Sequence, residues 1–116
     1  MPAAPWSIRL SQAAERDFRE IHEWTAAKFG ASQAEVYAAA VSMTIDALHG
    51  GPNVVGFKAH DEIATALRSA AVRVKRRDGR HLVFFRVFHD AHEIAIVRIL
   101  HVAMNPLLHL TPEPKA

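Results

Sequence analysis

Residues 80–110 read RHLVFFRVFHDAHEIAIVRILHVAMNPLLHL, and this stretch decides the fold of the 116-residue chain. It contains two apolar runs, 80–88 and 93–101, whose β-branched and aromatic residues suit strands on a covered, pleated surface. Only the polar segment from His89 to His92 separates them, and so short a connection joins antiparallel neighbours, because a parallel crossover needs a dozen or more residues. Residues 80–101 are therefore predicted to form a hairpin, and apolar side chains on both of its faces place it in the middle of a sheet.

Three arginines, Arg80, Arg86 and Arg98, interrupt these apolar strands. Two guanidinium groups on one sheet face can hold phosphates or carboxylates through bidentate hydrogen bonds. A three-residue turn would place Arg86 and Arg98 on the same face, and a four-residue turn on opposite faces, because one residue of slip inverts the pattern. The alternative is that each arginine extends its charged end to solvent or pairs with an acidic residue of a helix.

The composition is that of one globular domain. Half of the residues are hydrophobic and 22% are charged, and a chain of this length buries roughly two-thirds of the surface that its unfolded form exposes. The formal charge of +2 suits an acidic partner without identifying nucleic acid. Because cysteine is absent, disulfides and thiolate metal sites are excluded, and a reducing cytoplasm is the expected compartment. No run reaches the ~20 apolar residues of a membrane span, so no membrane partner is expected. The domain is predicted to cover residues 6–110, between flexible tails at 1–5 and 111–116.

Ahead of the hairpin, the sequence predicts a short strand at residues 6–10, at an edge of the sheet, and then two helices. Ser11 is the expected N-cap of the first helix, residues 12–29, and Gly30 is expected to end it. Ser32 and Glu35 have the spacing of a capping box at the start of the second helix. The apolar positions that recur at helical spacing in the first helix are predicted to face inward: Ala14, Phe18, Ile21, Thr25 and Phe29.

The second helix is apolar nearly all round. Its inward face is predicted to consist of Ala34, Tyr37, Ala38, Val41, Ile45 and Leu48. A second apolar stripe runs along the other side through Val36, Ala40, Met43 and Ala47. Either a partner covers this stripe, or its small alanines are helix formers tolerated on a surface.

Residues 53–66 give no clear prediction beyond a helical turn near 61–65. Residues 67–74, LRSAAVRV, are predicted to form a strand, and the basic residues 75–79 a solvated turn before the hairpin. The predicted order is strand, helix, helix and three strands. This order indicates an α+β fold in which a helical hairpin packs on one face of a mainly antiparallel sheet.

Neither a metal site nor a catalytic nucleophile is predicted. His89 and His92 flank Asp90, but these residues form a hairpin turn, where polar side chains are expected anyway. His22-Glu23 lacks the second histidine of a zinc-binding helix. The serines that a nucleophilic mechanism would need lack the glycine-framed turn that exposes such a residue: Ser11, Ser42 and Ser69. No metal or other cofactor is expected.

Short motifs across residues 8–110 resemble those of the ParE toxins in the RelE/ParE toxin–antitoxin superfamily. The most specific are Leu10-Ser11 with Ala14 and Asp17, the junction at residues 30–33, Arg80-His81-Leu82, Arg98-Ile99-Leu100-His101, and Met104, Pro106 and His109-Leu110. The resemblance implies a strand, a helical hairpin and an antiparallel sheet, which is the order that the residues predict independently.

The resemblance also implies a toxin that binds DNA gyrase, leaves it trapped on cleaved DNA, and is neutralised by a ParD-like antitoxin. The acidic or amphipathic C-terminal segment of such an antitoxin folds as it wraps the toxin, and DNA is contacted only indirectly, through the antitoxin complex. The residues expected to bind the antitoxin are Val36, Ala40, Met43, Ala47 and Arg73. The residues expected to bind the target or form the framework are Arg80, His81, Arg86, Arg98, His101 and Met104.

Two alternatives remain open in the sequence. A RelE-like ribosome-dependent mRNA endonuclease needs a base, a phosphate-binding cation and an acid, and Arg86 and Arg98 with His81 or His101 could supply them. Against it, the single tyrosine, Tyr37, lies in the helical hairpin, so no terminal tyrosine can stack on a base. The other alternative is a non-toxic module that retains only its antitoxin contact. The chain is therefore expected to act by binding rather than as an enzyme.

The sequence departs from the ParE pattern at three places that bear on the target. Histidine occupies position 22, where a tryptophan is common, and the loop at residues 51–65 is longer than expected. Val102-Ala103 replaces a more polar pair between His101 and Met104.

Overall fold

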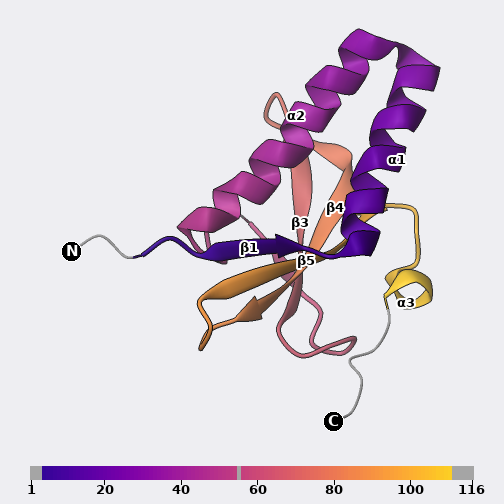
Figure 1. Cartoon of the computed structure of the whole chain (residues 1–116). Helices are drawn as coiled ribbons and strands as arrows, with labels where there is room; N and C mark the ends of the chain where they lie inside the picture. The colour runs from indigo at the N-terminus through magenta and orange to yellow at the C-terminus, as the bar shows by residue number, and fades with distance from the viewer. Residues whose placement is uncertain (1–3, 55, 111–116) are drawn as a thin grey trace.

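A mixed five-stranded sheet forms the centre of the molecule, in the strand order β1-β5-β4-β3-β2. The computed structural model describes residues 4–54 and 56–110, so the predicted tails lie largely outside the described residues. A hairpin of helices α1 and α2 packs on the sheet, and a short helix α3 follows the last strand (Figure 1). This arrangement confirms the predicted α+β fold. The elements are β1 (Ser7–Leu10), α1 (Gln12–Phe29), α2 (Ala31–Ala47), β2 (Lys58–Ala59), β3 (Leu67–Val74), β4 (Arg77–Phe88), β5 (Glu93–His101) and α3 (Pro106–His109).

The β4–β5 hairpin occupies the middle of the sheet, as predicted. Strand β4 is antiparallel to both β3 and β5. Strand β1 lies at one edge, also as predicted, but it runs parallel to β5, with Ser7 opposite Glu93. At the other edge, β2 pairs only with Arg68 and Ser69. Within the described residues, the outer edge of β3 beyond Ser69 therefore has no strand beside it.

A β-bulge in β5 resolves the question of the two strand arginines. The turn at residues 89–92 has four residues, and Phe88 is opposite Glu93, so the turn alone would place the arginines on opposite faces. After Phe84, which is opposite Arg98, the pairing shifts by one residue and Phe85 is opposite Ile96. The extra residue inverts the pattern a second time. Arg86 and Arg98 therefore stand on the same face as Phe84.

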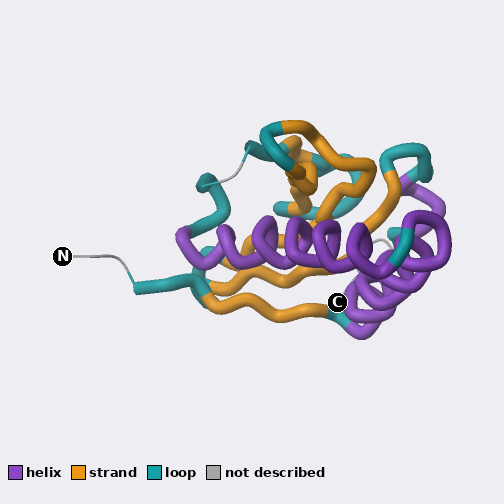
Figure 2. Tube along the Cα trace, turned by 90° about the horizontal axis from the view of Figure 1, so that it is seen from above, coloured by secondary structure: helices purple, strands orange, loops and turns teal. Residues whose placement is uncertain are grey.

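Two apolar clusters cover the two faces of the sheet. The larger lies between the sheet and the helical hairpin, which extends over the strands when the molecule is seen from above (Figure 2). The smaller lies on the opposite face and contains Leu67, Phe84, Leu100 and Leu110. The neighbouring residues Phe84 and Phe85 thus belong to different layers, because successive side chains of a strand point to opposite faces. None of the helices in the described residues is both long enough and apolar enough to cross a bilayer.

The start of α2 differs from the prediction. Ser11 caps α1 as expected, since its Oγ accepts a hydrogen bond from the Ala14 amide at 2.9 Å. The Ser32–Glu35 capping box is wrong: α2 begins at Ala31, and no side chain caps it. Gly30, at φ 94°, ends α1 and also begins α2. Ser32 therefore already lies in the first turn, and Glu35 instead approaches His22 at 3.1 Å.

Two expectations about helix faces are also wrong. Phe29, predicted to face inward, is 62% exposed; it is the last residue of α1, and its ring meets the exposed Trp24 edge-on. Ala40, assigned to the outer stripe of α2, is buried in the main core. The outer stripe is consequently interrupted, and Val36 and Met43 are its exposed members.

The turn between β3 and β4 is shorter than predicted. Only Lys75 and Arg76 connect the strands, because Val74 already pairs with Arg77. Strand β4 therefore begins three residues before the predicted strand at residue 80. Both turn residues have positive φ, 50° and 70°, which is the conformation of a type I′ hairpin turn.

Candidate functional site

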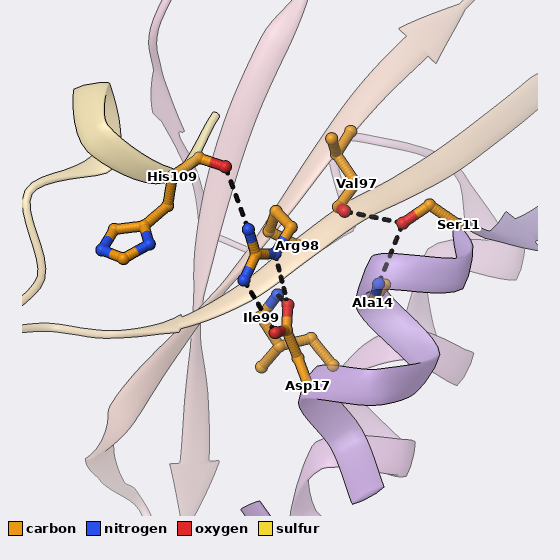
Figure 3. Close-up of polar contacts among 7 residues, drawn as sticks. All are labelled: Ser11, Ala14, Asp17, Val97, Arg98, Ile99 and His109. Carbon is orange, nitrogen blue, oxygen red and sulfur yellow. Dashed lines mark hydrogen bonds and ion pairs between the residues drawn. The ribbon is translucent and has the colours of Figure 1, made fainter. Parts of the chain in front are cut away.

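An ion pair joins the first helix to the last strand. The Arg98 guanidinium donates through Nε to Asp17 Oδ2 at 2.7 Å and through Nη2 to Oδ1 at 2.9 Å. Asp17 Oδ2 also accepts the Ile99 amide at 2.9 Å, and Arg98 Nη1 donates to the His109 carbonyl at 3.0 Å (Figure 3). The Asp17 carboxylate raises the pKa of Arg98 further above its usual range. Of the two alternatives for Arg98, the pairing with a helix carboxylate is confirmed.

Ser11 completes this junction. Its Oγ donates to the Val97 carbonyl at 2.7 Å while it accepts the Ala14 amide (Figure 3). The Ser11 amide donates to the Ile96 carbonyl. Strand β1 ends opposite Ile96. Past that point, the Ser11 hydroxyl bonds to the Val97 carbonyl and the buried Asp17 carboxylate bonds to the Ile99 amide. Side chains of α1 and its N-cap thus satisfy backbone groups of β5 that β1 does not reach.

A second cluster of polar side chains lies where α2 meets the ends of β4 and β5. The Tyr37 hydroxyl lies 2.7 Å from His81 Nδ1, and the His81 and His101 rings pack edge to face at 5.3 Å. Gly79 permits this arrangement, because a Cβ there would lie 3.0 Å from the Tyr37 hydroxyl oxygen. Burial is the main cause that lowers the pKa of His81 to about 4, and the nearby His101 contributes a smaller part. The imidazole is therefore neutral at physiological pH.

The low pKa of His81 predicts a loss of stability in acid. The unfolded chain binds this proton below about pH 6.5 and the folded chain only below about pH 4. Between these values the unfolded state holds more protons, so the free energy of unfolding falls as the pH falls. The ring is only half-buried, and solvent screening reduces the expected loss to about 1–2 kcal/mol. Urea unfolding across this window should show a smaller loss for His81→Gln than for wild type. Equal losses would contradict the assignment.

A hollow of about 860 Å³ runs from α2 past the outer edge of β3 to the face opposite the helices. Three of the five residues expected to bind an antitoxin, Ala40, Met43 and Arg73, line it, and so do His101 and Met104 from the expected target-binding set. Several further lining residues were not predicted to belong to a site, because they come from the segment 53–66, for which the sequence allowed no clear prediction: Val54, Phe57, Lys58 and His60.

The other predicted site residues lie outside this hollow. Val36 is exposed on α2, and Ala47 is half-buried near its end. Arg80 is exposed on β4. Arg86 donates to the Thr65 carbonyl at 3.1 Å and lies over the Phe88 ring. The structure thus gathers part of each predicted set on one surface and leaves the rest elsewhere.

A buried serine–histidine pair lies at the floor of the hollow. His60 Nε2 is 2.7 Å from Ser69 Oγ, and both residues are less than a tenth exposed. A serine beside a base can be a nucleophile, but Ser69 lies within a strand, and the exposed Glu62 carboxylate is 3.6 Å from the His60 ring, beyond hydrogen-bond distance. The pair instead satisfies two buried polar atoms and fastens the end of β2 to β3.

The histidines of the β4–β5 turn have a structural role as well. The His92 ring stacks on Trp6 at 4.2 Å and lies 2.8 Å from the Ala4 carbonyl, while His89 meets Trp6 edge-on. His49 approaches the Trp6 carbonyl at 2.9 Å. These contacts hold the segment that leads into β1.

Comparison with known proteins gives a consistent assignment. Residues 8–106 match the family model described as the ParE toxin of the type II toxin–antitoxin system parDE. The chain is 33% identical over 102 residues to Toxin ParE1 of Caulobacter vibrioides, covering 88% of this chain and 95% of that protein. It is 32% identical over 96 residues to Toxin ParE1 of Mycobacterium tuberculosis, covering 83% of this chain and 89% of that protein.

Solved structures share the fold. A chain of the chromosomal ParDE system of P. aeruginosa superposes with a TM-score of 0.66 at 19% identity, covering 85% of this chain and 98% of that one. A chain of the M. tuberculosis toxin–antitoxin complex RelBE2 gives 0.57 at 21% identity, with coverages of 84% and 98%. The family match spans the Asp17–Arg98 junction and the His81–His101 cluster. Because it covers most of the sequence, the chain belongs to the ParE toxins of type II toxin–antitoxin systems.

Proposed function

We propose that this ParE-family toxin inhibits DNA gyrase in the cytoplasm and is neutralised by a ParD-like antitoxin that occupies the hollow beside β3. The observation that carries the proposal is that one surface contains members of both predicted sets of residues. Ala40, Met43 and Arg73 line the hollow together with His101 and Met104. An antitoxin bound there covers residues that the target needs, so neutralisation follows from occupancy alone.

The chemistry of the hollow suits an acidic, amphipathic segment. Exposed apolar side chains line it, among them Met43 at 72% and Phe57 at 40% exposure. Lys58 and Arg73 are its cations, and Asp78, which already pairs with Arg73 at 3.3 Å, is its carboxylate. The outer edge of β3 beyond Ser69 also offers backbone groups to which an extended segment can add as a strand.

The endonuclease alternative receives no comparable support. It requires the strand arginines and a histidine to converge on one phosphate. Although Arg86 and Arg98 share a sheet face, Arg98 is held by Asp17 and the His109 carbonyl, whereas Arg86 contacts the Thr65 carbonyl and Phe88. His81 is bonded to Tyr37 on the helical side. The groups point to different partners.

The proposal is tested with purified toxin, gyrase and the ParD-like antitoxin encoded beside the toxin gene. We expect the toxin to block supercoiling and to increase gyrase-dependent DNA cleavage, and an equimolar amount of antitoxin to restore supercoiling. Met43→Asp places a carboxylate in the hollow among apolar side chains, so calorimetry should show antitoxin binding weakened at least tenfold.

Phe29→Asp is the matched control, because Phe29 is similarly exposed but lies at the far end of α1. It should bind the antitoxin like wild type. A toxin without effect on gyrase would refute the target, and cleavage of ribosome-bound mRNA would replace it with the endonuclease alternative. Equal antitoxin affinities for the two variants would refute the hollow as the antitoxin site.

A further inference from the structure

The positive charge of the chain is concentrated at the tip of the β3–β4 hairpin. Residues 73–80 read RVKRRDGR, with five cations and one carboxylate, so the tip carries +4 while the whole chain carries +2 and the remainder −2. All five cationic residues are exposed. A charge gradient of this kind orients the tip toward a polyanion.

Most of these cations are available. Arg73 is engaged, since it pairs with Asp78 and donates to the Arg76 carbonyl at 2.6 Å. The other four, Lys75, Arg76, Arg77 and Arg80, make no ion pair within residues 4–54 and 56–110. Asp78, the one carboxylate of the tip, therefore pairs with Arg73, which also bonds to the turn backbone, and leaves the other four cations unpaired by it.

The turn places residues other than glycine or asparagine in a left-handed backbone conformation. Lys75 and Arg76 both have positive φ, a conformation that favours Asn-Gly in a two-residue hairpin turn. Gly79 lies nearby but outside the turn. Long cationic side chains thus occupy the two positions where small residues would be more stable, and such departures concentrate at functional sites.

We propose that the hairpin tip, residues 73–80, binds the phosphate backbone of double-stranded DNA directly. A two-stranded ribbon fits the major groove, which is about 12 Å wide, and cations alone suffice for contact with duplex phosphates. The tip contains no aromatic residue on which single-stranded bases could stack. Val74, its only large apolar residue, packs against the main core, so the tip has no apolar anchor for an acidic peptide. This inference goes beyond DNA contact through an antitoxin complex.

The test measures the anisotropy of a labelled 30-base-pair duplex with the purified chain at about 50–200 mM salt, in the absence of gyrase and antitoxin. The variant Lys75→Asn/Arg76→Gly supplies the preferred turn residues and removes two cations. We expect its melting temperature to rise, its duplex affinity to fall about tenfold or more, and its log–log salt slope to flatten by about 1.8. The control Arg16→Gln/Arg19→Gln removes the same charge from exposed positions of α1 and should bind nearly like wild type.

Equal losses in the two variants would assign binding to net charge and overturn the proposal. Wild-type protein that fails to bind the duplex at 50 mM salt would overturn it too, as would tighter binding to single-stranded RNA or to polyglutamate. Because gyrase is absent, none of these outcomes bears on the gyrase proposal.

Discussion

Replacing Asp17 by alanine is expected to lower the free energy of unfolding by about 3–5 kcal/mol. The substitution removes three hydrogen bonds, leaves the Ile99 amide without this acceptor and leaves the Arg98 guanidinium with the His109 carbonyl but no carboxylate. The Asp17 side chain is only 9% exposed and that of Arg98 25%, so water replaces the lost contacts poorly. Domains of this size are stable by about 5–15 kcal/mol. Urea denaturation of the variant should therefore show a protein close to the limit of folding.

Arg9→Ala provides the comparison, because it removes an ion pair with Glu93 whose arginine side chain is 66% exposed. Its cost should stay below about 1 kcal/mol. Asp17→Asn keeps an acceptor for the Ile99 amide and should fall between the two. Equal costs for Asp17→Ala and Arg9→Ala would show that the junction contributes nothing beyond a surface pair.

Replacing Phe85 by alanine should cost about 3–5 kcal/mol, because its ring is completely buried between the sheet and the helical hairpin. Phe85 packs in the main core with residues of both long helices and of the neighbouring strands, so the cavity is not expected to collapse fully. Phe84, one residue earlier, borders the hollow on the other face. Phe84→Ala should cost less, since solvent can enter the space from the hollow.

The same urea experiments, with Phe57→Ala as a control, measure this difference. Phe57 is 40% exposed, and its removal should cost below about 1 kcal/mol. Phe84→Ala that is more costly than Phe85→Ala would mean that the smaller cluster, rather than the main core, dominates stability.

Local signals account for the part of the fold that the sequence predicts. The Ser11 cap acts on a neighbouring amide, and the β4–β5 hairpin follows from two apolar runs and a four-residue break. The β5 bulge leaves no comparable trace, because Val97 continues an uninterrupted apolar run. Strand β2 has only two residues and exists through pairing with β3 rather than through its own composition.

The candidate site depends on contacts that are distant in sequence. Asp17 appears in the sequence as one more charged residue of a polar helix, and its partner Arg98 lies 81 residues away. The resemblance to ParE toxins marked both residues without indicating that they bond. The hollow likewise includes residues from a loop whose weak periodicity allowed no prediction of the surface they line: Val54, Gly56, Phe57, Lys58 and His60.

The junction between α1 and β5 has a consequence for how the toxin is made. Ser11 is hydrogen-bonded to a strand residue 86 positions later in the chain, and among the residues that the structure describes β5 is the one strand beside β1. Ribosomes add about 5–20 residues per second, so roughly 4–17 s pass between synthesis of the first strand and synthesis of its partner. Such high contact order slows folding. The amino-terminal strand of this toxin is thus translated several seconds before the strand beside which it pairs.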